Sequence, residues 1–152
     1  MAELKTKLEM ALREAMRSND DVRKRTLRMI LSAIRLAEVE KGNPLDDNTI
    51  LALLHKEIKS RRETIEDAQK GQRPDLVTAA EAEINVIQEF LPQALSEAEL
   101  TKLATAAIEE AGAKSLADMG KVMKLLIPRL QGRASGEAAS RVVRQLLQNQ
   151  GT

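Results

Sequence analysis

The sequence contains no cysteine, no tryptophan and no tyrosine, and Phe90 is its single aromatic residue. Without cysteine there is no disulfide, no thiolate nucleophile and no cysteine-ligated metal, a composition that suits a reducing compartment. Without aromatic rings the chain lacks the platforms on which most readers of single-stranded nucleic acid stack bases. The one histidine, His55, supplies neither a metal site nor a complete catalytic pair. We therefore expect no catalytic residue, no cofactor and no metal in this chain on its own.

Signatures of membrane insertion, secretion and nucleotide binding are missing as well. No apolar run approaches the about 18 residues that indicate a membrane-spanning helix. The N-terminus is charged from Glu3 onward, which does not fit the apolar core of a signal peptide. There is no Gly-x-x-x-x-Gly-Lys-Ser/Thr loop to hold nucleotide phosphates. These features predict a cytoplasmic protein without a membrane partner.

What the sequence does contain is helical periodicity along its whole length. Apolar residues recur at spacings of three and four, which is typical of amphipathic helices, and no stretch alternates as a strand would. The pattern predicts an all-α protein with an N-terminal four-helix domain over residues 1–93 and a C-terminal three-helix bundle over residues 94–152. Helices are expected over about 2–18, 21–41, 46–70, 74–91, 96–112, 115–127 and 136–148. We place the domain boundary at Pro92–Leu95, since Ser96 and Glu99 form a capping box that starts the next helix.

The second expected helix has apolar residues on two sides, which predicts a central helix with a packing partner on each. One side carries Leu27, Ile30, Leu31 and Ile34, and the other carries Val22, Met29, Ala33 and Leu36. The strip that remains is basic and holds Lys24, Arg25, Arg28 and Arg35. These cations either pair with acidic side chains of adjacent helices or form an anion-binding surface, and the local balance of charge favours pairing.

The last quarter of the chain is basic, although the net charge of the whole chain is only +1. From Lys114 to the C-terminus seven Lys or Arg stand against two acids, a net charge of +5. Two expected helices meet there at residues 132–136, where glycines free the backbone and a serine can cap the second helix. A helix start flanked by cations suits a phosphate group, although charged helix faces are commonly only solvated. The residues expected to contact RNA phosphate are Lys121, Lys124, Gly132, Arg133, Ser135, Gly136, Arg141 and Arg144.

Two residues interrupt the expected helix that starts at Ser115 and Asp118. Gly120 lies inside it, where glycine costs about 1 kcal/mol relative to alanine, so we expect another backbone to approach closely. Pro128 removes the hydrogen bond to the Lys124 carbonyl. We therefore expect this helix to end or bend near Ile127.

Several short motifs resemble a known family. Ala-Asp-Met-Gly-Lys-Val-Met at 117–123 and Gly-Arg-Ala-Ser-Gly at 132–136 are similar to the tail domain of the GatB/YqeY family, which closes the B subunit of the glutamine-dependent aminoacyl-tRNA amidotransferase. Glu-Phe-Leu-Pro at 89–92 and Arg-Met-Ile-Leu-Ser-Ala-Ile at 28–34 resemble the freestanding YqeY-like proteins, so the resemblance covers nearly the whole chain. Ser135 stands where the family more often has aspartate, and either residue can cap a helix.

The resemblance implies a function on tRNA. In the amidotransferase the similar tail contacts the tRNA body, whereas the catalytic domains have no counterpart here. We therefore expect a non-catalytic tRNA-binding module that reads RNA shape and backbone. One alternative is an accessory component of a carbon–nitrogen ligase with glutamine as amido-N-donor, acting on aminoacyl-tRNA beside amidotransferase or synthetase components. Another is a protein-interaction adaptor that uses the small-residue faces around Gly120 and Ala138/Ala139.

Overall fold

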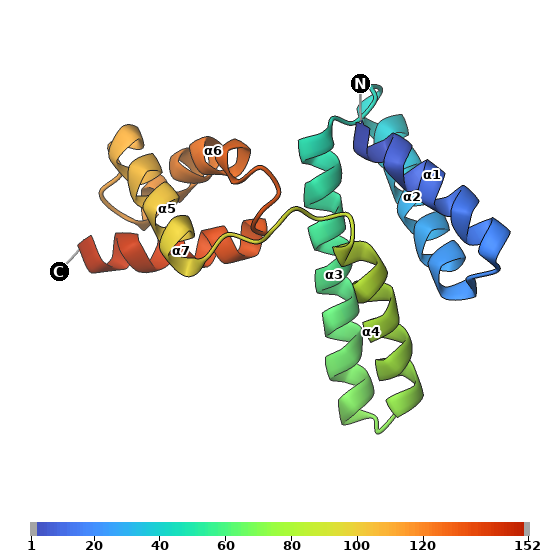
Figure 1. Cartoon of the computed structure of the whole chain (residues 1–152). Coiled ribbons are helices and arrows are strands. Elements are labelled where there is room, and N and C mark those ends of the chain that lie inside the picture. The colour runs from blue at the N-terminus through green and yellow to red at the C-terminus, as the bar shows by residue number, and fades with distance from the viewer. Residues whose placement is uncertain (1–2, 151–152) are drawn as a thin grey trace. The chain divides into compact units, whose positions relative to one another are not determined.

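The computed structural model describes residues 3–150, and over that range the chain forms seven α-helices, one short 3-10 helix and no β-strand (Figure 1). The predicted all-α class is therefore confirmed. The elements are α1 (Glu3–Ser18), α2 (Asp21–Lys41), α3 (Asp47–Lys70), α4 (Pro74–Gln88), α5 (Glu97–Ala111), the 3-10 helix η1 (Leu116–Asp118), α6 (Met119–Leu130) and α7 (Gly136–Gln150). Within residues 3–150, no helix is long and apolar enough to cross a membrane.

Contacts divide the chain into two compact units, Met1–Leu91 with α1 to α4 and Pro92–Thr152 with α5 to α7. Each unit has its own cluster of buried apolar side chains. In the first unit Leu27 and Ile34 are fully buried, and in the second Leu126 and Val143 are. Burying one such side chain contributes about 1.5–3 kcal/mol, so each unit has its own hydrophobic driving force. That the units are domains divided between residues 93 and 94 stays a prediction.

The first unit consists of two helical hairpins. Helix α1 packs along α2, and α3 packs along α4, with further contacts from α1 to α3 and from α2 to both α3 and α4 (Figure 1). Capping residues fix where the helices begin. Asp20 accepts a hydrogen bond from the Arg23 amide at the start of α2, and Asp46 accepts one from the Thr49 amide at the start of α3.

Glu38 of α2 joins three segments of the first unit. Its carboxylate accepts a hydrogen bond from Lys5 Nζ of α1 at 2.8 Å and another from the backbone N–H of Leu45, before α3, at 3.0 Å. The hydrogen bond from Lys5, followed by the one from Leu45, holds the pKa of Glu38 below its ordinary value of 4.5. The charged form of Glu38 therefore stabilises the fold.

We expect the first unit to lose stability as the pH falls below 4.5, the ordinary pKa of Glu38. A carboxyl group with a lowered folded-state pKa contributes its full stabilisation above the unfolded value and loses it as the pH falls through the folded value. In Glu38→Gln this part of the acid dependence should disappear from urea-unfolding curves recorded between about pH 7 and about pH 3. Glu40→Gln, an exposed neighbour on α2, should keep the parent's acid dependence. Identical pH profiles for the two variants would show that Glu38 is not the group responsible.

The second unit is built from three mutually packed helices, α5, α6 and α7. Its first helix starts with one half of the predicted capping box, because the Glu99 carboxylate accepts from the Ser96 hydroxyl and not, as predicted, from the Ser96 backbone N–H. Ser96 Oγ accepts a hydrogen bond from the Glu99 amide at 3.1 Å, and its hydroxyl donates to the Glu99 carboxylate at 3.1 Å. The N–H of Leu95 donates to the Arg133 carbonyl at 2.9 Å, which ties the residues before α5 to the turn between α6 and α7.

The structure departs from the expected sixth helix at three points: its start, its end near Ile127 and the close approach expected at Gly120. Asp118 accepts the Lys114 N–H at 2.9 Å whereas Ser115 makes no side-chain cap, so η1 precedes α6 and α6 begins only at Met119. The helix does not end near Ile127 but continues to Leu130 with Pro128 inside it. A proline this close to the helix end deletes a single hydrogen bond, and the burial of Leu130, 3% exposed, holds the last turn against the core. A Cβ atom on Gly120 would meet nothing within 4 Å, so no backbone approaches it.

The expectation of two covered sides on α2 is wrong in part. The side with Leu27, Ile30 and Ile34 is buried against the rest of the first unit. On the other side, Leu36 is 62% exposed and Met29 is 48% exposed. The apolar cluster of the first unit packs against the buried side of α2, and Leu36 on the other side stays exposed.

Candidate functional site

The turn between α6 and α7 has the local structure that its glycines and serine predict. Gln131 and Gly132, directly after the end of α6, both adopt positive φ angles, 50° and 73°. Ser135 Oγ then accepts a hydrogen bond from the Ala138 amide at 3.0 Å, which confirms the predicted cap of α7. Gly136 begins that helix, and a Cβ there would make an ordinary 3.6 Å contact with Ile127. Only Gly132 is therefore required to be glycine by its backbone conformation.

Arg133 joins the α6–α7 turn of the second unit to the segment before α5 and to α5 itself. Its Nε donates to the Gln93 carbonyl at 2.9 Å, and its Nη2 lies 3.4 Å from a Glu99 carboxylate oxygen. The Arg133 carbonyl accepts the Leu95 N–H noted above. These contacts hold the segment before α5 against the turn, so the guanidinium already has protein partners on two sides.

The remaining predicted cations lie on the outer sides of two helices. Lys121 and Lys124 are exposed on α6, on the side opposite buried Val122 and Leu126. The corresponding cations of α7 are Arg141, which pairs with Glu137 at 3.6 Å, and Arg144, which is exposed.

The predicted phosphate contacts thus come from three elements of the second unit. The turn contributes Gly132, Arg133 and Ser135, Gly136 begins α7, and the remaining residues lie on α6 (Lys121, Lys124) and α7 (Arg141, Arg144). Ala138 and Ala139, expected on an adaptor surface, instead pack in or against the core of the second unit, where Ala139 is fully buried. The assignment of these residues to phosphate contacts stays a prediction.

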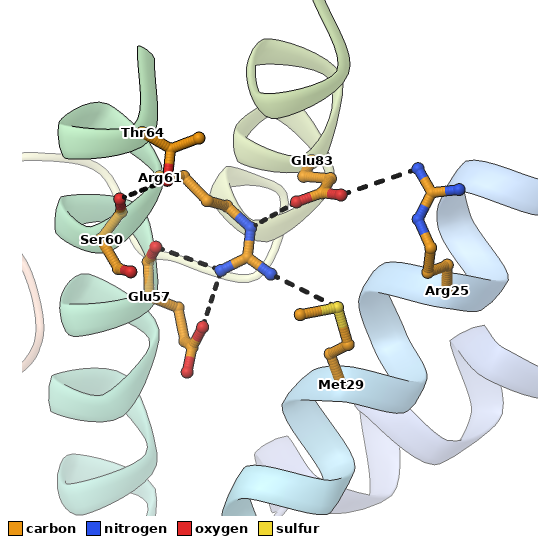
Figure 2. A network of polar contacts seen from close by, with 7 residues as sticks. All are labelled: Arg25, Met29, Glu57, Ser60, Arg61, Thr64 and Glu83. Atoms are coloured by element: carbon orange, nitrogen blue, oxygen red, sulfur yellow. Dashed lines mark hydrogen bonds and ion pairs between the residues drawn. The ribbon is translucent and has the colours of Figure 1, made fainter. Parts of the chain in front are cut away.

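Sequence reasoning missed a polar cluster that surrounds Arg61 of α3 (Figure 2). Only 7% of the Arg61 side chain is exposed. Its Nε donates to Glu83 of α4 at 2.8 Å, and its Nη1 donates to the carboxylate and the carbonyl of Glu57 at 2.7 and 3.1 Å. Its Nη2 lies 3.9 Å from the sulfur of Met29 on α2. One guanidinium therefore joins α2, α3 and α4.

The Arg61 network extends to the outer part of α2. Glu83 also pairs with Arg25 of α2 at 3.6 Å, so one carboxylate faces two arginines (Figure 2). The predicted pairing of the α2 cations with adjacent helices is thus confirmed for Arg25. Lys24 pairs instead within its own helix, with Asp21 at 3.1 Å. Arg28 and Arg35 are exposed and make no ion pair within the described range, residues 3–150.

A signal for Arg61 was present in the sequence. Ile58 and Ile65 belong to the buried stripe of α3, and Arg61 lies three residues after the first and four before the second, in line with that stripe. An arginine in an apolar register is buried only when carboxylates pair with it. Since carboxylates, a carbonyl and a thioether take up its donors, the network fixes the position of α2 rather than offering a reactive group. Among residues 3–150, no set of three or more His, Asp or Glu is grouped so that it could hold a metal ion.

Comparison with known proteins gives a consistent set of relatives. A family model for Yqey-like proteins matches residues 5–147. The chain is 40% identical over 96 residues to "Altered inheritance of mitochondria protein 41, mitochondrial" of Lachancea thermotolerans, covering 61% of this chain and 51% of that protein. Proteins of the same name are 29% identical over 146 residues in Pyrenophora tritici-repentis (93% of this chain, 79% of that protein) and 30% identical over 83 residues in Saccharomyces cerevisiae (54% and 45%). The chain thus spans about half the length of the first relatives, at 51% and 46%.

These relatives correct the expected function and location. Their name refers to the inheritance of mitochondria and mentions neither tRNA nor an amidotransferase, so the expected tRNA-binding function is contradicted. The ligase-accessory alternative falls with it, and the adaptor alternative loses its expected surface because Ala138 and Ala139 pack in or against the core. The expected cytoplasmic location is contradicted too, because the same relatives are named as mitochondrial. The sequence motifs indicated the right family, but the function inferred from them was that of another member, the amidotransferase B subunit.

The resemblance to the GatB/YqeY family is itself confirmed, because the matched region takes in nearly every described residue of both compact units. The chain belongs to the YqeY-like protein family.

Proposed function

We propose that this chain shares the molecular role of its relatives named for altered inheritance of mitochondria, and that it works in mitochondria. The observation that carries the proposal is the similarity to the Pyrenophora tritici-repentis protein, which extends over 93% of this chain. A match of that extent spans both the α1–α4 unit and the α5–α7 unit. The shared part is therefore the whole helical architecture rather than one borrowed segment.

We further infer that the two compact units are separate domains, a four-helix domain over residues 1–93 and a three-helix domain over residues 94–152. The support is that each unit has its own buried apolar cluster. In addition, the second unit begins with a local helix start of its own, the Ser96 cap of α5.

The test is replacement of the relative in living cells. Saccharomyces cerevisiae lacking its relative would express this chain behind a mitochondrial targeting leader, and the fraction of daughter cells that inherit mitochondria would be counted. We expect the chain to restore inheritance to the level given by the yeast protein. The leader fused to an unrelated protein is the control and should not restore it. Failure of a folded, imported chain would overturn the shared role, and rescue by a chain that cell fractionation finds only outside mitochondria would overturn the proposed location.

A further inference from the structure

The outward side of α2 combines exposed apolar side chains with exposed arginines. Leu27, Ile30 and Ile34 are fully buried, which fixes the opposite side of the helix toward solvent. On that side Val39 is 78% exposed, Leu36 62% and Met29 48%. We define the α2 outer face by six residues, Arg28, Met29, Ser32, Arg35, Leu36 and Val39.

The α2 outer face has the form of a helix-packing site. Ser32 is a small, exposed residue, and the positions three and four away on each side are Arg28, Met29, Arg35 and Leu36. Met29, Ser32, Leu36 and Val39 stand at i, i+3, i+7 and i+10, the a/d spacing at which two helices pack side by side in a coiled coil. A small residue in this row lets a side chain of the facing helix approach closely.

The positive charge of the α2 outer face lies along one of its edges. At about 100° per residue, Arg28 and Arg35 lie along one edge of the face, and Met29 and Leu36 lie along the other. Neither arginine has an ion-pair partner within the part of the chain described. Arg25, one turn earlier, adds further positive charge. Its partner Glu83 lies 3.6 Å away but is 2.8 Å from Arg61, so this one carboxylate is shared between two arginines (Figure 2). The face is therefore complementary to a surface that has a row of apolar side chains with carboxylates along one edge of the row.

We propose that the α2 outer face binds an amphipathic helix of a partner protein that carries leucine-like side chains on one ridge and Asp or Glu along its edge. A second copy of this chain is disfavoured, because a twofold contact through this face would set Arg28 and Arg35 against the same arginines in an antiparallel pair, or against the Met29 and Leu36 edge in a parallel pair. A flat anionic membrane would meet the charges but offers no side chains spaced to pack between those of the a/d row. The Arg61 network supports this use by holding α2 through Met29 and Arg25, so the face is preorganised.

The experiment uses the full 152-residue chain and a synthetic helical peptide of about 20 residues, with leucine at alternating three- and four-residue spacing and glutamate along one edge. Binding is followed by fluorescence anisotropy of the labelled peptide. We expect saturable binding that weakens with salt. The double variant Arg28→Glu/Arg35→Glu should weaken it by at least about tenfold, because attraction becomes repulsion. Leu36→Ser should weaken it independently, and Arg62→Glu on the exposed side of α3 should leave it unchanged.

A peptide with lysine in place of glutamate is the second control and should not bind. The proposal is overturned if the acidic peptide does not bind, or if it binds the parent and the double variant equally. Binding only to vesicles of phosphatidylcholine and phosphatidylglycerol would overturn it in favour of a membrane surface. Self-association that Leu36→Ser abolishes, without peptide binding, would overturn it in favour of a second copy. Each of these outcomes is independent of the mitochondrial replacement test.

Discussion

Glu83→Ala is expected to lower the free energy of unfolding of the first unit by about 3 kcal/mol. The substitution leaves the Arg61 guanidinium, 7% exposed, without the carboxylate that Nε contacts at 2.8 Å. An uncompensated buried charge is strongly destabilising, and the effect lies at the lower end of the usual range because Glu57 still pairs with Arg61 at 2.7 Å. Urea unfolding followed by circular dichroism gives the value, since the chain has no tryptophan or tyrosine to report by fluorescence.

Two comparisons make this prediction specific to the buried charge. Glu81→Ala, an exposed glutamate on the same helix, should change stability by no more than about 0.5 kcal/mol. The double variant Arg61→Met/Glu83→Leu should be more stable than Glu83→Ala, because no buried charge is left unpaired. If Glu83→Ala is as stable as Glu81→Ala, the network contributes little to the position of α2.

Leu126→Ala is expected to lower the stability of the second unit by about 3 kcal/mol and to leave the first unit unchanged. Leu126 is fully buried in the cluster of α5, α6 and α7, so its truncation removes apolar contacts and leaves a cavity. For a unit of this size that loss is a large part of its total stability. Amide hydrogen exchange, resolved along the chain by mass spectrometry, should show faster exchange in residues 97–150 only.

Ile127→Ala is the matched control for Leu126→Ala. Ile127 is the next residue on the same helix but is 42% exposed, so its truncation should have a much smaller effect on exchange. Faster exchange throughout both units in Leu126→Ala would contradict the inference of two domains. It would mean that the chain unfolds as one cooperative body.

Most of the helical architecture follows from patterns that are local in the sequence. Glycine after α2 and α5, Asp46 before α3 and the Ser96 cap all act over a few residues, so the sequence predicts those helix ends. The errors arise where a distant contact overrides the local preference. Pro128 alone favours an earlier end of α6, but burial of Leu130 extends the helix past it. Met29 and Leu36 look like core residues by spacing, yet both stay exposed on the outer side of α2.

The candidate sites were less accessible to sequence reasoning, because they depend on pairing across helices. The basic excess of the last quarter suggested one surface, but Arg133 is engaged by Gln93 and Glu99. Arg61 went unnoticed because its partner Glu83 lies on another helix, 22 residues away in sequence. The function expected by family resemblance was contradicted for a different reason: one helical fold serves proteins with different roles, so motifs identify the family before they identify the role.

The central claim is that this chain carries the role of its mitochondrial relatives, and a chimera tests it most directly. Since the chain spans about half the length of the first relatives, it would replace only the matched segment of the Saccharomyces cerevisiae protein, of which 45% aligns with this chain. The measurement is the fraction of daughter cells that inherit mitochondria in cells lacking the native protein. We predict that the chimera restores inheritance to the native level. A chimera that is imported and folded but leaves inheritance as defective as an empty vector does would contradict the claim.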